Sequence, residues 1–188
     1  MPPSRNGKEP ADSGRPASVR IAGPADVEAL YWLLLGDLQA DNSLGVPVSA
    51  REVARIVRKL CSGDGGIVGV IDGLHGKPVG SVAIEAAKPW FSDTWILSQV
   101  WLFVTVDERH GQHFADDLFS FAEWHRADMS AKVGYDMVLE NTVMSRTRLP
   151  AKIRLWGRHG QQIGGVFWTG AGNGQEHNEV GHTGDNGA

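Results

Sequence analysis

The chain has 188 residues, of which 41% are hydrophobic and 21% charged, values that are ordinary for one soluble globular domain. Lys and Arg number 18 and Asp and Glu 22, so the formal net charge is −4. This argues against a general nucleic-acid or membrane-surface binder, because such proteins usually carry a basic face. The one cysteine, Cys61, excludes an intramolecular disulfide and the zinc sites that are built on several cysteines.

The N-terminal residues contain no apolar segment typical of a signal peptide, and no stretch approaches the ~20 apolar residues of a membrane helix. We therefore expect a cytoplasmic protein. Both ends of the chain are polar. The composition predicts a disordered arm over residues 1–17, rich in Pro, Ser, Gly and Arg, and a disordered tail over residues 170–188, rich in Gly, Asn and His. The folded domain then spans residues 18–169.

The first half of this domain begins with a short strand at 19–22 and a helix that opens at Pro24. Ser49 is expected to cap a second helix, with Glu52 completing a capping box. Apolar residues recur at helical spacing in both segments. They are Val27, Leu30, Tyr31, Leu34 and Leu38 in the first helix, and Val53, Ile56, Val57 and Leu60 in the second.

The second half reads as strands with two helices between them. The helix after the third of these strands has one apolar face that runs from Phe114 to Met129, and Pro150 lies near the start of the last helix. The strands are expected at 66–72, 79–87, 95–106, 135–141 and 164–168. The order β-α-α-β-β-β-α-β-α-β predicts an α/β fold, with a mixed central sheet of about six strands flanked by about four helices.

The segment "FVTVDERHGQHFADDLF", residues 103–119, passes from a buried strand directly into a helix. A helix N-terminus has free N–H groups and the positive end of the helix dipole, so this junction suits an anion such as a diphosphate. Arg109 would add a charge-assisted contact. The alternative is an ordinary strand–turn–helix junction, in which Asp116 and Asp117 act as acidic residues of the first helical turn.

The order of elements resembles the GNAT superfamily of N-acyltransferases over roughly residues 19–169. That family places a pyrophosphate-binding loop, Arg or Gln, two residues, Gly, one residue, then Gly or Ala, at the start of the helix after its fourth strand. Here the motif is degraded: His110 stands at the basic position beside Gly111, His113 replaces the middle Gly, and Ala115 takes the last position. The downstream "KIRLWGRHGQQIGGVF" is similar to the family's second signature, and the eroded loop resembles that of divergent phage-type members.

The resemblance implies that acetyl-CoA is the co-substrate and that an amine is the acceptor, a small molecule or a protein. Backbone N–H groups of the loop would hold the pyrophosphate, and Val104 and Val106 would align the pantetheine. Asn141 is a further pantetheine candidate, or else part of a strand-end turn. The residues expected to bind the cofactor are Val104, Val106, Arg109, His110, Gly111, Gln112, His113, Phe114, Ala115, Asn141 and Lys152.

Three residues are candidates for catalysis. Trp156 stands where the family often has a Tyr acid, and an indole N–H donates a hydrogen bond without being a useful acid. Glu85 and Glu140 lie in predicted strands and are candidate general bases, although the pattern around Glu85 favours a carboxylate on the solvent face of a half-exposed strand. The spacing of His110, His113 and Asp116 would pass for metal ligands, but no second cluster accompanies it and we expect no metal.

Two other functions compete with acyl transfer. The missing Tyr and eroded glycines are compatible with a GNAT-like module that binds CoA or a partner without turnover. Modification of nucleic-acid bases is a further alternative, against which the charge of −4 counts. The sequence leaves the acceptor open and permits a monomer or a homodimer.

Overall fold

The computed structural model describes residues 14–40, 45–105, 113–141 and 149–159. Over these ranges the chain forms one sheet in the spatial order β1-β2-β3-β4-β5. The first four strands are antiparallel neighbours, and β5 runs parallel to β4. The strands are β1 (Arg20–Ile21), β2 (Gly66–Asp72), β3 (Pro78–Ala87), β4 (Ile96–Val104) and β5 (Leu139–Glu140).

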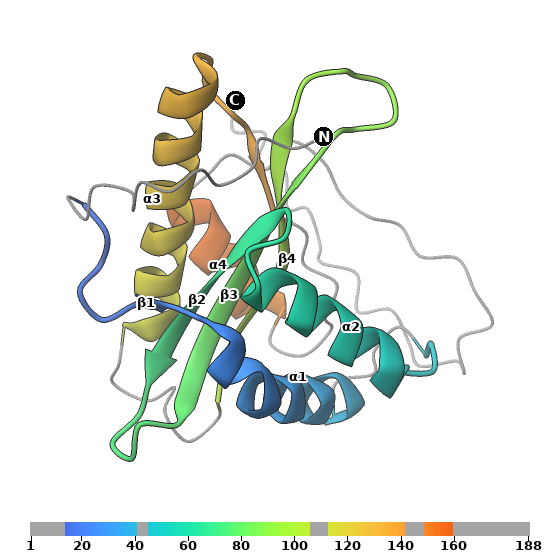
Figure 1. Ribbon diagram of the computed structural model, residues 1–188. Coiled ribbons are helices and arrows are strands. Elements are labelled where there is room, and N and C mark those ends of the chain that lie inside the picture. The colour runs from blue at the N-terminus through green and yellow to red at the C-terminus, as the bar shows by residue number, and fades with distance from the viewer. Residues whose placement is uncertain (1–13, 41–44, 106–112, 142–148, 160–188) are drawn as a thin grey trace, which may run out of the picture.

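The helices form a layer on each side of this sheet (Figure 1). Helices α1 and α2 cover one face, α3 covers the other, and α4 packs beside α3. The elements are the 3-10 helix η1 (Pro24–Asp26), α1 (Val27–Ala40), α2 (Ala50–Cys61), α3 (Phe114–Val133) and α4 (Leu149–His159). The predicted fold class is therefore confirmed, with five described strands in place of about six. The strand predicted at 164–168 lies outside the described residues.

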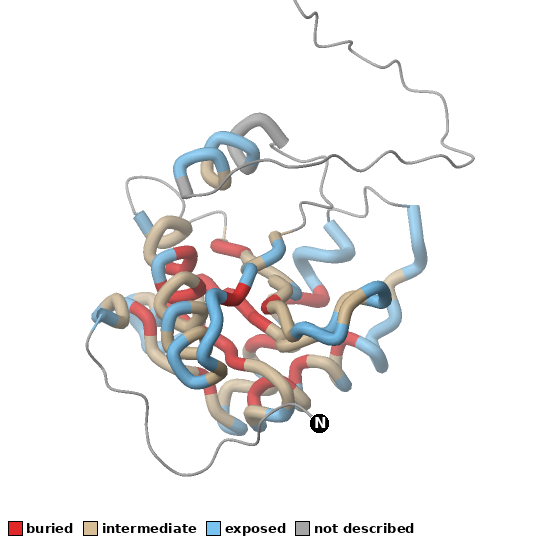
Figure 2. The backbone as a smooth tube through the Cα atoms, turned by 90° about the horizontal axis from the view of Figure 1, so that it is seen from above, coloured by how far each residue is buried: buried red, intermediate tan, exposed pale blue. Residues whose placement is uncertain are grey.

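Alternation along the strands supplies a separate apolar core to each layer. Ile67 and Val82 pack with the α3 side chains Leu118 and Phe121, whereas their chain neighbours pack under α1 and α2. Figure 2 shows the buried residues concentrated between the layers and the exposed ones around them. Gly69 faces α3, where a Cβ atom would lie 2.7 Å from the ring of Phe121, so only a glycine lets the two elements approach this closely.

Two details of the helices differ from the prediction. Leu38 is 42% exposed, since residues 36–40 at the end of α1 are all exposed, and Leu35 is buried in its place. Ser49 does cap α2, since its Oγ accepts a bond of 3.4 Å from the N–H of Glu52. The Glu52 carboxylate, however, accepts from Arg55 at 2.7 Å, so the expected capping box is only half present.

Strand β5 is shorter than the predicted 135–141. Gly134 ends α3 in the left-handed conformation, and the backbone that follows bonds to α3. Ser130 Oγ accepts from the Met137 N–H at 2.9 Å, and Arg126 donates to the Met137 carbonyl at 3.3 Å. These bonds occupy backbone groups that a longer strand would have used.

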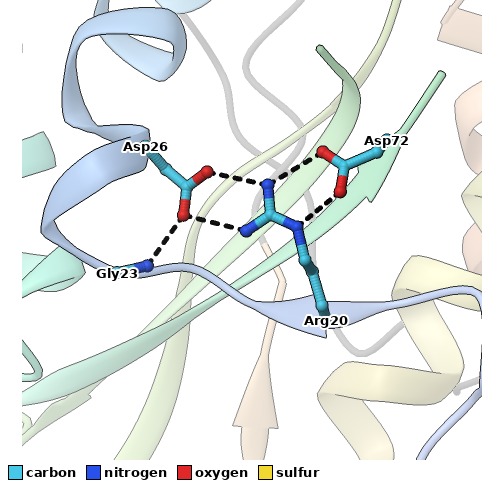
Figure 3. A network of polar contacts seen from close by, with 4 residues as sticks. All are labelled: Arg20, Gly23, Asp26 and Asp72. Carbon is cyan, nitrogen blue, oxygen red and sulfur yellow. Dashed lines mark hydrogen bonds and ion pairs between the residues drawn. The ribbon is translucent and has the colours of Figure 1, made fainter. Parts of the chain in front are cut away.

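A polar network fixes β1 against η1 and β2 (Figure 3). The guanidinium of Arg20 makes paired bonds to Asp26, at 2.9 and 2.7 Å, and also contacts both carboxylate oxygens of Asp72. The Gly23 N–H donates to Asp26 at 2.8 Å. Hydrogen bonds from Arg20 lower the pKa of Asp26, and those to Asp72 and Asp26 raise the pKa of Arg20. Arg20 is thus engaged by two carboxylates as a structural cation.

Within the described ranges, none of the helices combines the length and the apolar character that crossing a membrane requires.

Candidate functional site

Strands β4 and β5 pair over only two residues each. Leu97 is opposite Leu139 and Ser98 is opposite Glu140, after which β4 continues alone on this side to Val104. Among the described residues, no strand pairs with this edge of β4 beyond Ser98. Residues 142–148, which follow Asn141, lie outside the described residues, so the described pairing of β4 with β5 is confined to these two positions.

An irregularity in β4 lies at the same place. Ala83 of β3 pairs with Trp101 and Ile84 pairs with Gln99, so Val100 is an extra residue in the ladder. Such bulges bend a strand and increase its twist. The side chain of Val100 is correspondingly 37% exposed, although β4 is largely apolar.

The N-terminus of α3 follows the C-terminal end of β4 in the chain. His113 occupies the N-cap position without a side-chain cap bond, and its carbonyl accepts from the Asp117 N–H at 2.9 Å. Phe114 and Ala115 are half-buried at the start of the helix. Five residues predicted in this region, Val106, Arg109, His110, Gly111 and Gln112, lie outside the described residues.

The two acidic residues of the first turn of α3 have partners on other elements. Asp116 accepts two bonds from Arg158 of α4, at 2.8 and 3.0 Å, and Asp117 accepts from Ser18 Oγ at 2.7 Å. Asp116 is therefore charge-paired, which reduces the repulsion that it would exert on an anion at the helix N-terminus.

Two buried amide oxygens belong to the residues that follow the last described pair of β4 and β5. Gln99 Oε1 and Asn141 Oδ1 are buried and have no hydrogen-bond partner among the described residues. Asn141 was predicted as a site residue, and its Nδ2 donates only a long bond of 3.4 Å to the Leu139 carbonyl. Gln99 was missed. A polar pair, Ser98 and Gln99, interrupts the apolar run of residues 95–104 and was the available signal.

The face of the sheet on which α2 packs carries a row of polar side chains across three strands. Ser98 is in register with Glu85 of β3 on one side and with Glu140 of β5 on the other. Ser98 Oγ donates to Glu140 at 3.2 Å, and Lys59 of α2 forms an ion pair with Glu85. The structure thus places both predicted base candidates beside Ser98, on the two strands that flank β4. Glu140 is exposed, and Glu85 is about a quarter exposed.

Helix α4 presents Trp156 to α3. The Trp156 ring meets Phe119 edge-on, with centroids 5.0 Å apart, so the indole packs at the α3–α4 contact. Arg158 forms an ion pair with Asp116 at the same contact, although its side chain is partly exposed to solvent. The side chain of Lys152 lies outside the described residues.

Cys61 is a core residue. It is 4% exposed, and burial, with a smaller contribution from the charge of Asp26, raises the pKa of its thiol to about 11. A thiol with this pKa is a poor nucleophile at neutral pH. The described part of the chain contains no group of three His, Cys, Asp or Glu side chains placed to hold a metal ion.

A shallow groove of about 590 Å³ lies between α1 and α2 and is lined by side chains of both helices. Trp32 lines it and is 62% exposed, with Tyr31 packed edge-on against its ring. Arg51 and Arg58 of α2 line the other wall.

No protein-family model and no curated protein matches this sequence. Solved structures do match. A probable acetyltransferase aligns over 85% of this chain and 99% of its own, with a TM-score of 0.57 and 11% identity. The ribosomal-protein-alanine N-acetyltransferase of Brucella melitensis biovar Abortus 2308 aligns over 80% and 95%, with a TM-score of 0.54 and 15% identity. A predicted acetyltransferase with acetyl-CoA from Clostridium acetobutylicum aligns over 80% and 93%, with a TM-score of 0.57 and 11% identity. The chain therefore has the fold of GNAT-type acetyltransferases, as the resemblance implied.

Proposed function

We propose that the protein is an acyl-CoA-dependent N-acyltransferase that transfers an acetyl group from acetyl-CoA to a primary amine by direct attack in a ternary complex. The observation that carries this proposal is the GNAT-type fold itself, in which β5 runs parallel to β4 and α3 begins just after β4. The N-terminus of α3 offers N–H donors to a diphosphate.

Gln99 and Asn141, which follow the last described pair of β4 and β5, fit acetyl-CoA as a ligand. Two buried amide oxygens there have no described partner, and a buried unpaired polar group costs about 1–3 kcal/mol. A ligand that carries amide N–H groups would remove this cost. The proposed cofactor residues within the described ranges are Val104, His113, Phe114, Ala115 and Asn141, and the proposal extends to Val106, Arg109, His110, Gly111, Gln112 and Lys152.

Acetyl-CoA, when bound, supplies an activated acyl thioester. The chain's own task is then to hold an amine beside it and to remove a proton from that amine. Glu140 suits this task, because its carboxylate is exposed and is oriented by Ser98 Oγ. Glu85 is engaged by the ammonium group of Lys59, so we assign it a supporting role in the electrostatics of the acceptor side.

Trp156 is not assigned the role of an acid. Its ring packs on Phe119, and an indole N–H does not release a proton at ordinary pH. In this proposal the thiolate departs without a proton from α4. The same observation favours the second candidate, a GNAT-like module that binds CoA without turnover.

Release of free thiol from acetyl-CoA, measured over a broad panel of primary amines, distinguishes the two functions. Amine-dependent thiol release that saturates with the acceptor supports the transferase. Binding of acetyl-CoA with no thiol release over the whole panel identifies the module instead.

A further inference from the structure

The groove between α1 and α2 is formed by positions that the core of the domain does not need. Both helices turn buried side chains toward the sheet, Leu30 and Leu34 from α1 and Val53 and Val57 from α2. Other positions of the same two helices line the groove. Figure 1 shows α1 and α2 side by side on one face of the sheet, with α3 on the other face. The groove is therefore separated by the sheet from the helix at which the diphosphate is proposed to bind.

The α1 wall of the groove is aromatic. Trp32 lines it with 62% of its surface exposed, and the ring of Tyr31 meets the indole edge-on, with centroids 4.9 Å apart. An indole combines a large apolar surface with one N–H donor, and tryptophan is enriched among the residues that contribute most to protein–protein binding. Trp32 is thus suited to contact an apolar side chain of a ligand.

The α2 wall carries two arginines with a small side chain between them. Arg51, Ala54 and Arg58 line the groove and are three and four positions apart, so they follow one side of α2. The two arginines are separated by roughly 10 Å along the helix axis. Arg51 is 90% exposed and contacts its chain neighbour Glu52 at 3.3 Å, whereas Arg58 has no ion-pair partner within the described ranges. This wall therefore offers positive charge to a ligand, on a chain whose net charge is −4.

We infer that the groove binds an acidic amphipathic helix of a partner protein. The apolar face of that helix lies against Trp32, and two of its carboxylates, seven residues apart, meet Arg51 and Arg58. Two packed helices present a groove into which a third helix fits, and such binding uses contacts at i, i+3, i+4 and i+7. Carboxylates at i and i+7 have the same spacing of roughly 10 Å as the two arginines. This site goes beyond the proposed function and does not depend on it.

The lining favours a peptide over a nucleic acid. Val27, Ala50 and Ala54 give the groove an apolar lining, which suits aliphatic side chains better than a sugar–phosphate backbone. Two arginines neutralise few phosphates, whereas nucleic-acid affinity depends on many such contacts. Glu28 on the α1 wall would repel a phosphate, but a helix can place neutral or basic residues along that edge.

Fluorescence anisotropy of a labelled peptide, titrated with the full chain, tests this inference. The probe is a designed helix of about 18 residues, or five turns, with Leu and Phe on one face, Glu at seven-residue spacing along one edge and Lys along the other. A second peptide has Gln in place of each Glu. The test variants are Arg58→Glu and Trp32→Ala. Their matched controls are Arg154→Glu, at an exposed position of α4, and Trp90→Ala, at an exposed position between β3 and β4.

We expect the acidic peptide to bind wild type and both controls equally, and to bind Arg58→Glu and Trp32→Ala about tenfold more weakly. The Gln peptide should bind wild type more weakly than the acidic peptide does. No binding of the acidic peptide by wild type overturns the inference, as does equal binding by wild type and both groove variants.

Two further measurements test the other occupants of the groove. A labelled single-stranded RNA that binds wild type more tightly than the peptide, and is lost in Arg58→Glu, would assign the groove to nucleic acid and overturn the inference. Sedimentation of a wild-type dimer that Trp32→Ala dissociates would assign the groove to a second copy of the chain and overturn it as well. We expect no RNA binding that depends on Arg58 and no dimer that depends on Trp32.

Discussion

Lys59 of α2 forms an ion pair with Glu85 of β3, on the face of the sheet where Glu140 also lies. The pair distinguishes the two carboxylates, because Glu85 has a cationic partner whereas Glu140, among the described residues, accepts a hydrogen bond from the hydroxyl of Ser98. We therefore expect Glu140→Gln to lower kcat/KM for the amine acceptor by about 100-fold, a typical loss for a general base. Glu85→Gln should lower it less than about tenfold.

Steady-state kinetics over pH 6–9 check this order. In Glu140→Gln the loss should appear in kcat/KM, while the affinity for CoA stays as in wild type. If Glu85→Gln is the more damaging variant, the roles assigned to the two carboxylates are wrong.

The bonds between Arg20 and Asp26 should make part of the free energy of unfolding depend on pH in the acid range. The pKa of Asp26 is lowered in the folded state, chiefly by its hydrogen bonds to Arg20. Its contribution is therefore fully present above the unfolded pKa of about 3.9 and is lost as the pH falls through the lower folded pKa. Arg20→Met should cost about 1 kcal/mol at pH 7, a modest figure because the Arg20 side chain is 41% exposed.

Urea unfolding at pH 7 and at pH 3 tests this prediction. Wild type should lose more stability than Arg20→Met between these two pH values. An identical acid dependence in both proteins would contradict the role given to the Arg20–Asp26 pair.

Replacement by alanine should lower the stability of the fold at Gly69 and raise it at Gly36. A Cβ atom at Gly69 meets the Phe121 ring at 2.7 Å and Val19 at 3.0 Å, so Gly69→Ala should destabilise the fold by about 1–3 kcal/mol through overpacking. Gly36 lies in α1 with open space around it, and Gly36→Ala should stabilise by up to about 1 kcal/mol. Thermal unfolding of both variants measures the difference, and a stabilising Gly69→Ala would show that β2 and α3 do not pack as described.

Cys61 should resist alkylation while the protein is folded. Its thiol is buried, with a pKa of about 11, so little thiolate exists at pH 8. Iodoacetamide at pH 8, followed by intact mass, should modify the unfolded protein in minutes and the native protein far more slowly. Rapid modification of the native protein would argue against the packing of α2 on the sheet.

The sequence predicts most of the layer arrangement, because apolar residues recur at strand or helix spacing and local residues mark where the elements begin and end. Strand β2 was predicted at 66–72 from its apolar residues and the turn that follows, and these are its observed bounds. Ser49 signalled the start of α2 through local cap chemistry. Both signals depend on residues that are close in the chain.

The site was less predictable, because it depends on strand register. Ser98 stands opposite Glu140, 42 positions later in the chain, and β5 was predicted too long because Ser130 and Arg126 bind the backbone of Met137. No local pattern encodes these contacts. The pairing of Asp116 with Arg158 is equally non-local, and it changes the interpretation of an acidic first turn in α3.

The most direct test of the account is isothermal titration of the wild-type chain with acetyl-CoA, beside His113→Glu and His75→Glu. His113 is the exposed N-cap residue of α3, where a new carboxylate would repel a diphosphate without disturbing the core. His75 is exposed in the turn between β2 and β3 and provides the same substitution away from the site. The account predicts micromolar binding by wild type and His75→Glu, weakened at least tenfold in His113→Glu. No binding by wild type, or equal binding by all three proteins, would contradict a cofactor site at the start of α3.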